Sequence, residues 1–225
     1  MTLAIDHLVI AAPDLDTGAE YVADALGIAP QGGGAHPGMG THNRVLGMFG
    51  QMYLEVIAID PSAPAPQRPR WFALDTEAMQ QRLRDGPFLA HWAARVERPT
   101  DLSRWQAQYP DRIAPPVPMT RGALQWRLTV PDDGSLPAWR GEAASAGDGV
   151  FPTLIQWDVA DHPGVSLPRH DLALRKLRGK HPQAELLRQG LAWIGATGAI
   201  EIEHTDGPPL LEAEIETPAG LKTLR

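Results

Sequence analysis

Two short apolar stretches of the chain share one pattern of hydrophobic and polar positions. Residues 5–10 (Ile-Asp-His-Leu-Val-Ile) and residues 89–96 (Leu-Ala-His-Trp-Ala-Ala-Arg-Val) each carry a histidine near the start of an apolar strand. Each stretch leads through a proline-marked turn into a segment with an aspartate that can cap a helix. A repeat of this kind decides the fold, so the pattern predicts that the chain uses one structural unit twice.

Hydrophobic periodicity gives both units the same order of elements. In the first unit, the predicted elements are a strand at 3–10, a helix at 15–26, a glycine-rich loop at 31–41, and strands at 42–46 and 52–59. In the second unit, they are a strand at 89–96, a helix at 102–108, a strand at 123–130, an excursion at 132–149 rich in small and polar residues, and a closing strand at 151–158.

The segments outside the two units do not follow the full pattern of the repeat. Residues 60–70 are too rich in proline for regular structure and predict an extended linker, followed by a short helix at 74–84. Beyond residue 160, a strand at 171–178, a helix ending near Ile194 and a hairpin around Asp206 predict a partial third copy.

The composition of the chain limits which metal ligands and which partners are possible. The 225 residues are 43% hydrophobic, which is enough for a proper core. The chain has no cysteine, so any metal must bind nitrogen or oxygen. The formal charge is −7 and no run of Lys or Arg forms a stripe, which disfavours nucleic acid as a partner. No window approaches the roughly 18 apolar residues of a membrane span, so we expect a cytoplasmic protein with no membrane partner.

Three residues stand out on the predicted strands. Strand alternation puts His7 on one face with Val9, where its imidazole can bind a metal or remain a hydrogen-bonded core histidine; His91 has the same two readings. Glu55 lies in an otherwise apolar strand, and a buried carboxylate is costly unless it is paired or coordinates a cation. A metal ion, or a salt bridge to Arg44 or Arg127, are the open alternatives.

Several motifs together resemble a known family. They are Ile5-Asp6-His7-Leu8-Val9, Gly40-Thr41-His42-Asn43, Tyr53-Leu54-Glu55, and Pro152-Thr153-Leu154-Ile155-Gln156-Trp157 leading to His162-Pro163-Gly164. They resemble the glyoxalase-like branch of the vicinal oxygen chelate superfamily over nearly the whole chain. The resemblance implies an α+β protein in which paired βαβββ modules form curled sheets around a central metal-binding cavity. The chain would add a C-terminal partial module.

On this reading the chain divides into four parts. They are a first βαβββ module at 1–60, the linker and short helix at 61–86, a second βαβββ module at 87–160, and a C-terminal partial βαββ module at 161–225.

The resemblance also implies a metal site. In that family the ligands lie on the first and fourth strands of each module, which here implies His7, Glu55, His91 and Gln156 around a divalent zinc, nickel, manganese or iron ion. Gln156 departs from the pattern because an amide cannot act as a general base, so Glu55 is the candidate catalytic base. The two histidines with Glu55 also match the facial triad of non-haem iron oxygenases, and His162 is a rival fourth ligand.

Other polar residues on or beside the candidate strands could bind substrate or could simply be solvated. They are His42, Asn43, Arg44, Arg121, Gln125 and Arg127. An arginine in the cavity would clamp a carboxylate or phosphate, so we expect a small anionic substrate.

Three functions are compatible with these residues. The first is a metal-dependent, glyoxalase-like enzyme of lyase or isomerase type that acts on a small oxygen-bearing metabolite. The second is a metal-free small-molecule binding or resistance-type protein, and the third is an iron-dependent ring-cleaving dioxygenase. The partner in each case is a small molecule, and a homodimer is left open. Fold resemblance alone cannot choose among the three.

Overall fold

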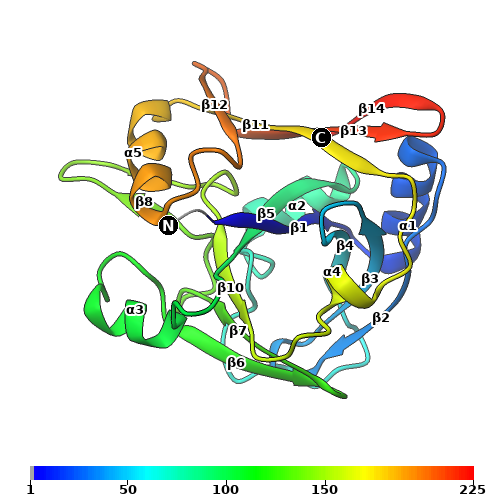
Figure 1. The fold of residues 1–225 in the computed structure, drawn as a ribbon, viewed down its shortest axis with the longest axis horizontal. Helices are drawn as coiled ribbons and strands as arrows, with labels where there is room; N and C mark the ends of the chain where they lie inside the picture. Colours follow the sequence, from blue (N-terminus) through cyan, green and yellow to red (C-terminus); the bar gives the residue numbers. More distant parts are fainter. Residues whose placement is uncertain (1–2) are drawn as a thin grey trace.

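An eight-stranded sheet forms the body of the protein (Figure 1). The structure is a computed structural model and describes residues 3–225. The strand order is β2-β3-β4-β1-β5-β10-β7-β6. The strands are β1 (Ala4–Ala11), β2 (Gln31–His36), β3 (Thr41–Met48), β4 (Met52–Ile59), β5 (Phe88–Arg95), β6 (Pro116–Arg121), β7 (Leu124–Thr129) and β10 (Thr153–Trp157). Because this order is symmetrical about the β1–β5 pair, the two halves are structural repeats.

Both halves place a helix after their first strand, as the repeated motif predicts. The Asp14 side chain accepts from the Thr17 amide at the start of α1 (Leu15–Leu26), and Gly27 ends that helix with a φ of 79°. The Asp101 side chain caps α3 (Leu102–Gln108) in the same way. The predicted α+β fold of paired βαβββ modules is therefore confirmed.

Strand pairing fixes how the repeats correspond. The first strand of each half pairs in parallel with the last, so that Val9 lies opposite Glu55 and Ala93 lies opposite Thr153. Between the halves, β1 and β5 are antiparallel, with Val9 opposite His91. In the repeat, therefore, Val9 corresponds to Ala93 and Glu55 corresponds to Thr153.

The structure differs from the sequence prediction at three segments. The glycine-rich stretch expected as a loop forms β2 and the 3₁₀ turn η1 (Pro37–Met39). Strand β6 was not predicted because it contains two prolines, which an edge strand tolerates. Helix α2 begins at Glu77 rather than at residue 74, since Thr76 caps it.

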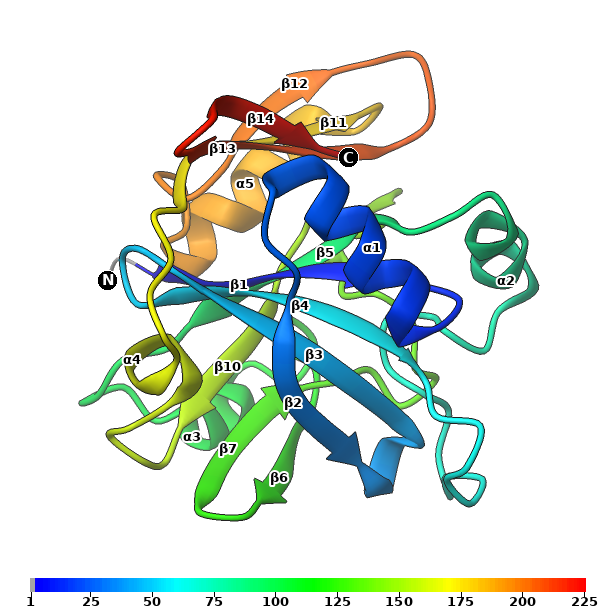
Figure 2. The same cartoon turned by 90° about the vertical axis from the view of Figure 1, so that its right-hand side faces the viewer.

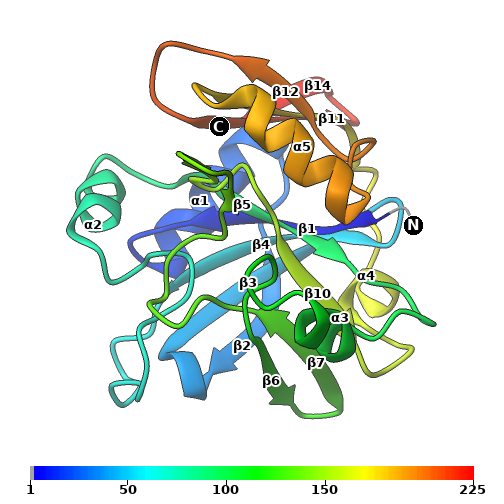
Figure 3. The same cartoon turned by 90° about the vertical axis from the view of Figure 1, so that its left-hand side faces the viewer.

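A second sheet covers the convex face of the large sheet, across β1 and β5 (Figure 2). Its strand order is β12-β11-β13-β14, from β11 (Ala173–His181), β12 (Glu201–His204), β13 (Leu210–Thr217) and β14 (Gly220–Leu224). Here the first strand, β11, pairs in parallel with the second, β12, unlike in either half of the large sheet. Helix α5 (Ala184–Ile194) lies beside this sheet, and α3 packs on β10 and β6 of the large sheet (Figure 3).

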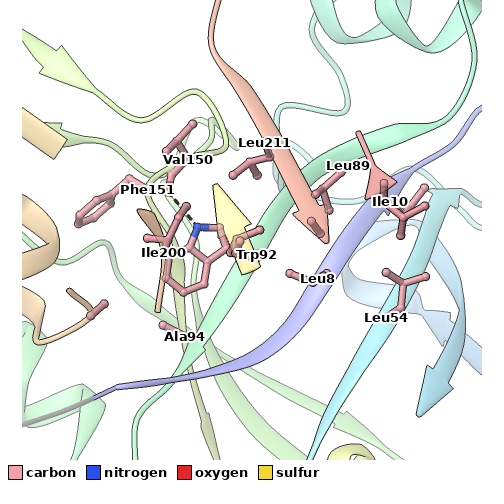
Figure 4. Close-up of a cluster of buried hydrophobic side chains, with 14 of the residues drawn as sticks. Leu8, Ile10, Leu54, Leu89, Trp92, Ala94, Val150, Phe151, Ile200 and Leu211 are labelled. Atoms are coloured by element: carbon pink, nitrogen blue, oxygen red, sulfur yellow. Dashed lines mark hydrogen bonds between the residues drawn. The ribbon is translucent and has the colours of Figure 1, made fainter. Parts of the chain in front are cut away.

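The core between the two sheets is centred on Trp92 (Figure 4). This side chain is fully buried, and its indole Nε1 donates to the Val150 carbonyl oxygen at 2.9 Å. Leu8 and Ile10 on β1 and Leu211 on β13 pack in the same cluster. From His7 onward, the even-numbered residues of β1 thus face the second sheet, which leaves the odd-numbered residues for the opposite, concave face.

Short elements complete the fold. The excursion at 132–149 contains a small hairpin of β8 (Trp139–Arg140) and β9 (Ser145–Ala146), and α4 (Pro163–Ser166) follows the large sheet. Among residues 3–225, no helix has the length and apolarity that crossing a membrane requires.

Candidate functional site

A narrow cavity of about 30 Å³ lies on the concave face of the large sheet. Its polar lining residues come from both halves, because the sheet curls until β2 approaches β6. The lining consists of His7, His36, Asn43, Tyr53, Glu55 and Arg121 together with Trp71, Phe72, Trp126, Leu128, Ile155, Trp157 and Pro163.

A β-bulge turns two adjacent side chains of β1 into this region. In the pairing with β5, Ile5 lies opposite Ala94 and His7 lies opposite Ala93, so Asp6 is an extra residue. The Asp6 carboxylate is fully buried and bonds His7 Nδ1 at 2.8 Å. In a regular strand Asp6 would face away from His7.

Three donors converge on the Asp6 carboxylate. Besides His7, these are the Trp157 indole Nε1 at 3.0 Å and the Arg95 guanidinium at 3.3 Å. Burial alone would raise the pKa of Asp6, but the hydrogen bond from His7 and the charges of His7 and Arg95 hold it below its ordinary value. Asp6 is therefore an ionised carboxylate inside the protein.

His7 lies between two carboxylates. Its Nε2 is 3.5 Å from Glu55 Oε2, and its ring stacks on Tyr53 with centroids 4.7 Å apart. Burial alone would lower the pKa of His7, but the hydrogen bond and charge of Asp6 and the charge of Glu55 raise it above its ordinary value. These carboxylates thus favour the protonated form of His7, whose Nε2 is directed toward Glu55.

Glu55 is 6% exposed as a residue, and an amide holds its carboxylate from the side opposite His7. Asn43 Nδ2 donates to Glu55 Oε1, while Asn43 Oδ1 accepts from Arg121 at 2.9 Å and from the Gly34 amide at 2.9 Å. The neighbouring Gly33 has a φ of 90°, and a Cβ there would lie 2.0 Å from the Asn43 carbonyl oxygen. Glycine therefore allows β2 to approach β3 and to support Asn43.

His36 adds a neutral imidazole to the wall. Its Nδ1 contacts the Thr41 hydroxyl at 3.1 Å, and its Nε2 lies 3.4 Å from both Asn43 Nδ2 and Arg121 Nη1. Burial, with the nearby Arg121 charge, lowers the pKa of His36 to about 4, although the Glu55 charge opposes this. Nε2 is consequently an acceptor at neutral pH.

The second half contains a closed counterpart of the His7–Glu55 pair. His91 corresponds to His7, and its Nε2 bonds the Thr153 hydroxyl at 2.9 Å, at the position that corresponds to Glu55. The Gly149 carbonyl oxygen accepts a hydrogen bond from Nδ1 of His91 at 3.0 Å. Burial lowers the pKa of His91 to about 3, so this histidine is a neutral core residue.

Gln156 lies on the convex face. Its Oε1 accepts from the Leu102 amide at 2.9 Å and from Arg127 at 3.0 Å, and its Nε2 donates to the Thr100 carbonyl oxygen at 2.6 Å. Because Thr153 is the residue that corresponds to Glu55, residue 156 has the opposite strand parity and faces α3. Gln156 therefore anchors α3 to the sheet.

The predicted four-ligand metal set is not assembled in the described part of the chain. Within residues 3–225, no three His, Asp or Glu side chains are placed to hold one metal ion. Only His7 and Glu55 come together, and His7 Nδ1 is already bound to Asp6. This donor set does not fit a resident divalent ion held by four ligands.

We expect the substitution Gln156→Glu to destabilise the protein without creating any response to metal. The new carboxylate cannot donate to the Thr100 carbonyl oxygen, and losing that bond costs about 1–3 kcal/mol of unfolding free energy. Thermal melts with excess nickel or zinc and with chelator should show the same loss. A variant stabilised by metal alone would place a metal ion beside residue 156.

The predicted substrate-binding residues divide between the two faces. Asn43 and Arg121 line the cavity. Arg44 instead pairs with Asp16 of α1 at 2.6 Å, and Arg127 pairs with Asp158 at 2.8 Å. His42, which shares the parity of Arg44, is also outside the cavity lining.

Sequence reasoning missed four residues of the region and left one as a rival ligand. The missed residues are Asp6, His36, Tyr53 and Trp71. Asp6 was next to a candidate, but the bulge that turns it is not visible in the sequence. His162, the rival ligand, caps α4 through Nδ1 and stacks on Trp157, outside the cavity lining.

Comparison with known proteins agrees with this architecture. The family model for the glyoxalase-like domain matches residues 5–195. A hypothetical protein from Staphylococcus aureus has a similar fold, with a TM-score of 0.59 at 13% identity over 99% of this chain and 84% of that one. Methylmalonyl-CoA epimerase from Mycobacterium tuberculosis aligns with a TM-score of 0.41 at 17% identity, over 68% of this chain and 86% of that one. A search of the curated proteins finds no match. With the family match covering most of its length, the chain belongs to the glyoxalase-like domain family.

Proposed function

We propose that this protein is an enzyme of lyase or isomerase type that moves a proton on a carbon atom of a small, oxygen-bearing anion. The observation that carries the proposal is the buried Asp6–His7–Glu55 unit in the cavity wall. A carboxylate and an imidazole with a raised pKa, held side by side out of bulk water, are the kinds of group that general acid–base catalysis uses.

Glu55 is the proposed base. It would take the proton from a carbon next to a carbonyl or carboxylate group and return it to the same or a neighbouring atom. Negative charge would then develop on a substrate oxygen, where the His7 imidazolium and the Arg121 guanidinium stabilise it. Asn43 fixes the Glu55 carboxylate in place through its amide.

The closed second half supports a single reacting centre. In the symmetrical arrangement implied by the family resemblance, both halves supply ligands to one ion. Here the corresponding His91 is occupied by Thr153 and Gly149. The chemistry proposed for this chain therefore passes through the side chains of the first half and through Arg121.

The test is carbon-bound proton exchange with solvent. Small 2-oxo, 2-hydroxy and 3-oxo acids are incubated with the protein in D₂O, and loss of the C–H signal is followed by proton NMR. We expect exchange in at least one class and a loss of about 100-fold or more in Glu55→Gln, since a positioned acid or base contributes roughly 10²–10⁴-fold.

The matched control is Glu20→Gln, because Glu20 is an exposed glutamate on α1. This variant should exchange protons at the wild-type rate. Exchange that survives unchanged in Glu55→Gln would remove Glu55 from the mechanism. Binding of the same acids with no exchange by the wild-type protein would favour a binding protein over an enzyme.

A further inference from the structure

Trp71 lines the cavity and carries a hydrogen-bond donor that has no partner in the described part of the chain. The residue is 3% exposed, and its indole Nε1 is buried with no hydrogen-bond partner among residues 3–225. Buried N–H groups in native proteins almost always have an acceptor, so an orphan of this kind needs an explanation. A ligand oxygen in the cavity would provide one.

The backbone after Trp71 is held in an unfavourable conformation. Phe72 and Ala73 both have a φ of 57°, in the left-handed region that residues with a side chain seldom adopt. The Ala73 amide donates to the Gly134 carbonyl oxygen at 2.8 Å, and Phe72 stacks on Trp71 with ring centroids 5.4 Å apart. Strained segments of this kind cluster where a protein clamps a ligand.

The charges in the cavity indicate which kind of ligand oxygen would accept the hydrogen bond from Trp71. Arg121 and His7 line the same space, whereas the Glu55 carboxylate is engaged by Asn43 and His7. A ligand that satisfies Trp71 must bring an oxygen acceptor, and Arg121 favours an anionic one.

The size of the cavity distinguishes between two anions. A volume of about 30 Å³ has room for about two water molecules, which the two oxygens of a carboxylate can replace. A phosphate group is larger and would bring a further charged oxygen toward Glu55. The space therefore fits the carboxylate end of a small acid.

We propose that the cavity binds the carboxylate group of a small acid, and that Trp71 donates its indole N–H to one of the carboxylate oxygens. Arg121 supplies the opposite charge. This inference rests on the site of the proposed function and adds the chemical class of its ligand and a specificity-determining residue.

The test is a binding titration followed by NMR of the ¹⁵N-labelled protein. The probes are acetate, acetamide as its neutral isostere, and inorganic phosphate. The Trp71 indole resonance is identified as the signal missing from Trp71→Phe. We expect acetate to shift that resonance in a saturable way, and acetamide and phosphate to bind at least about tenfold more weakly.

Two variants complete the experiment. Trp71→Phe keeps an aromatic ring against His36 and Phe72 but removes the donor, so acetate affinity should fall by about tenfold or more. Trp193→Phe changes a 36% exposed tryptophan on α5 and should leave acetate affinity unchanged.

Several results would overturn the inference. They are the absence of acetate binding, an unmoved Trp71 resonance at saturation, equal binding of acetamide or phosphate, or unchanged affinity in Trp71→Phe. Acetate binding that depends on Trp71, without carbon-bound proton exchange, would keep the inference and contradict the proposed enzyme function. Carbon-bound proton exchange with an unchanged KM in Trp71→Phe would keep the proposed enzyme function and contradict the inference about Trp71.

Discussion

Trp92→Ala is expected to lower the free energy of unfolding by about 3–5 kcal/mol, a large part of the stability of a typical domain. Trp92 is fully buried between the large sheet and the second sheet, in the same cluster as Leu8, Val150 and Ile200 (Figure 4). Truncation leaves a cavity and also removes the donor to the Val150 carbonyl oxygen. Urea unfolding followed by circular dichroism measures the effect.

Two further variants separate packing from the hydrogen bond. Trp92→Phe keeps most of the apolar contact but loses the indole N–H, so its loss should be intermediate. Trp193→Ala removes a partly exposed ring on α5 and should cost clearly less than Trp92→Ala. A loss below about 1 kcal/mol in Trp92→Ala would mean that the two sheets do not share this core.

Acid should destabilise the protein by several kcal/mol between pH 6.5 and 4.5, because two buried histidines resist protonation. Burial lowers the pKa of His36 to about 4 and that of His91 to about 3. In this interval the unfolded chain binds protons at both positions and the folded chain does not. Unfolding free energy therefore falls with pH, by up to about 1.4 kcal/mol per pH unit for each histidine.

The other charged groups of the site do not reverse this trend. The pKa of His7 is raised, so its stabilising contribution is fully present below pH 6.5 and is lost only at higher pH. The pKa of Asp6 is lowered, so its contribution is present above pH 3.8 and is lost only in stronger acid. Within the interval both contributions stay constant.

His91→Gln tests the assignment. Urea unfolding at several pH values should give a lower stability at pH 7 and a clearly shallower dependence on pH, since one of the two histidines with a strongly lowered pKa is gone. His204→Gln is the control because His204 is an exposed histidine on β12. A slope in His91→Gln as steep as in the wild-type protein would contradict the low pKa of His91.

The two halves of the large sheet share one fold but place their histidines in different chemical environments. Each half aims a histidine of its first strand at a residue of its last strand, His7 at Glu55 and His91 at Thr153. In the first half, Asp6 and Glu55 raise the pKa of His7, and this histidine lines the cavity. A hydroxyl in the second half, with the Gly149 carbonyl oxygen, leaves its histidine neutral and enclosed.

The sequence by itself determined the repeated architecture. The histidine-bearing strands and the aspartate-capped helices recur in the same order, which predicts two copies of one unit, and alternation within β1 placed His7 on the functional face. Glu55 was identifiable because a carboxylate within an apolar strand must find a partner. These features depend on local periodicity and burial cost, which a single sequence carries.

Only the tertiary structure decided which residues meet. The parity of Gln156 depends on the register of β10 against β5, and a shift by one residue exchanges the two faces of a strand. The bulge at Asp6, the approach of Arg121 from β6 to Asn43 on β3, and the position of Trp71 over the cavity all depend on the curl of the sheet and the path of a loop. Such contacts join residues far apart in the chain through packing, and no local pattern of hydrophobic and polar positions encodes them.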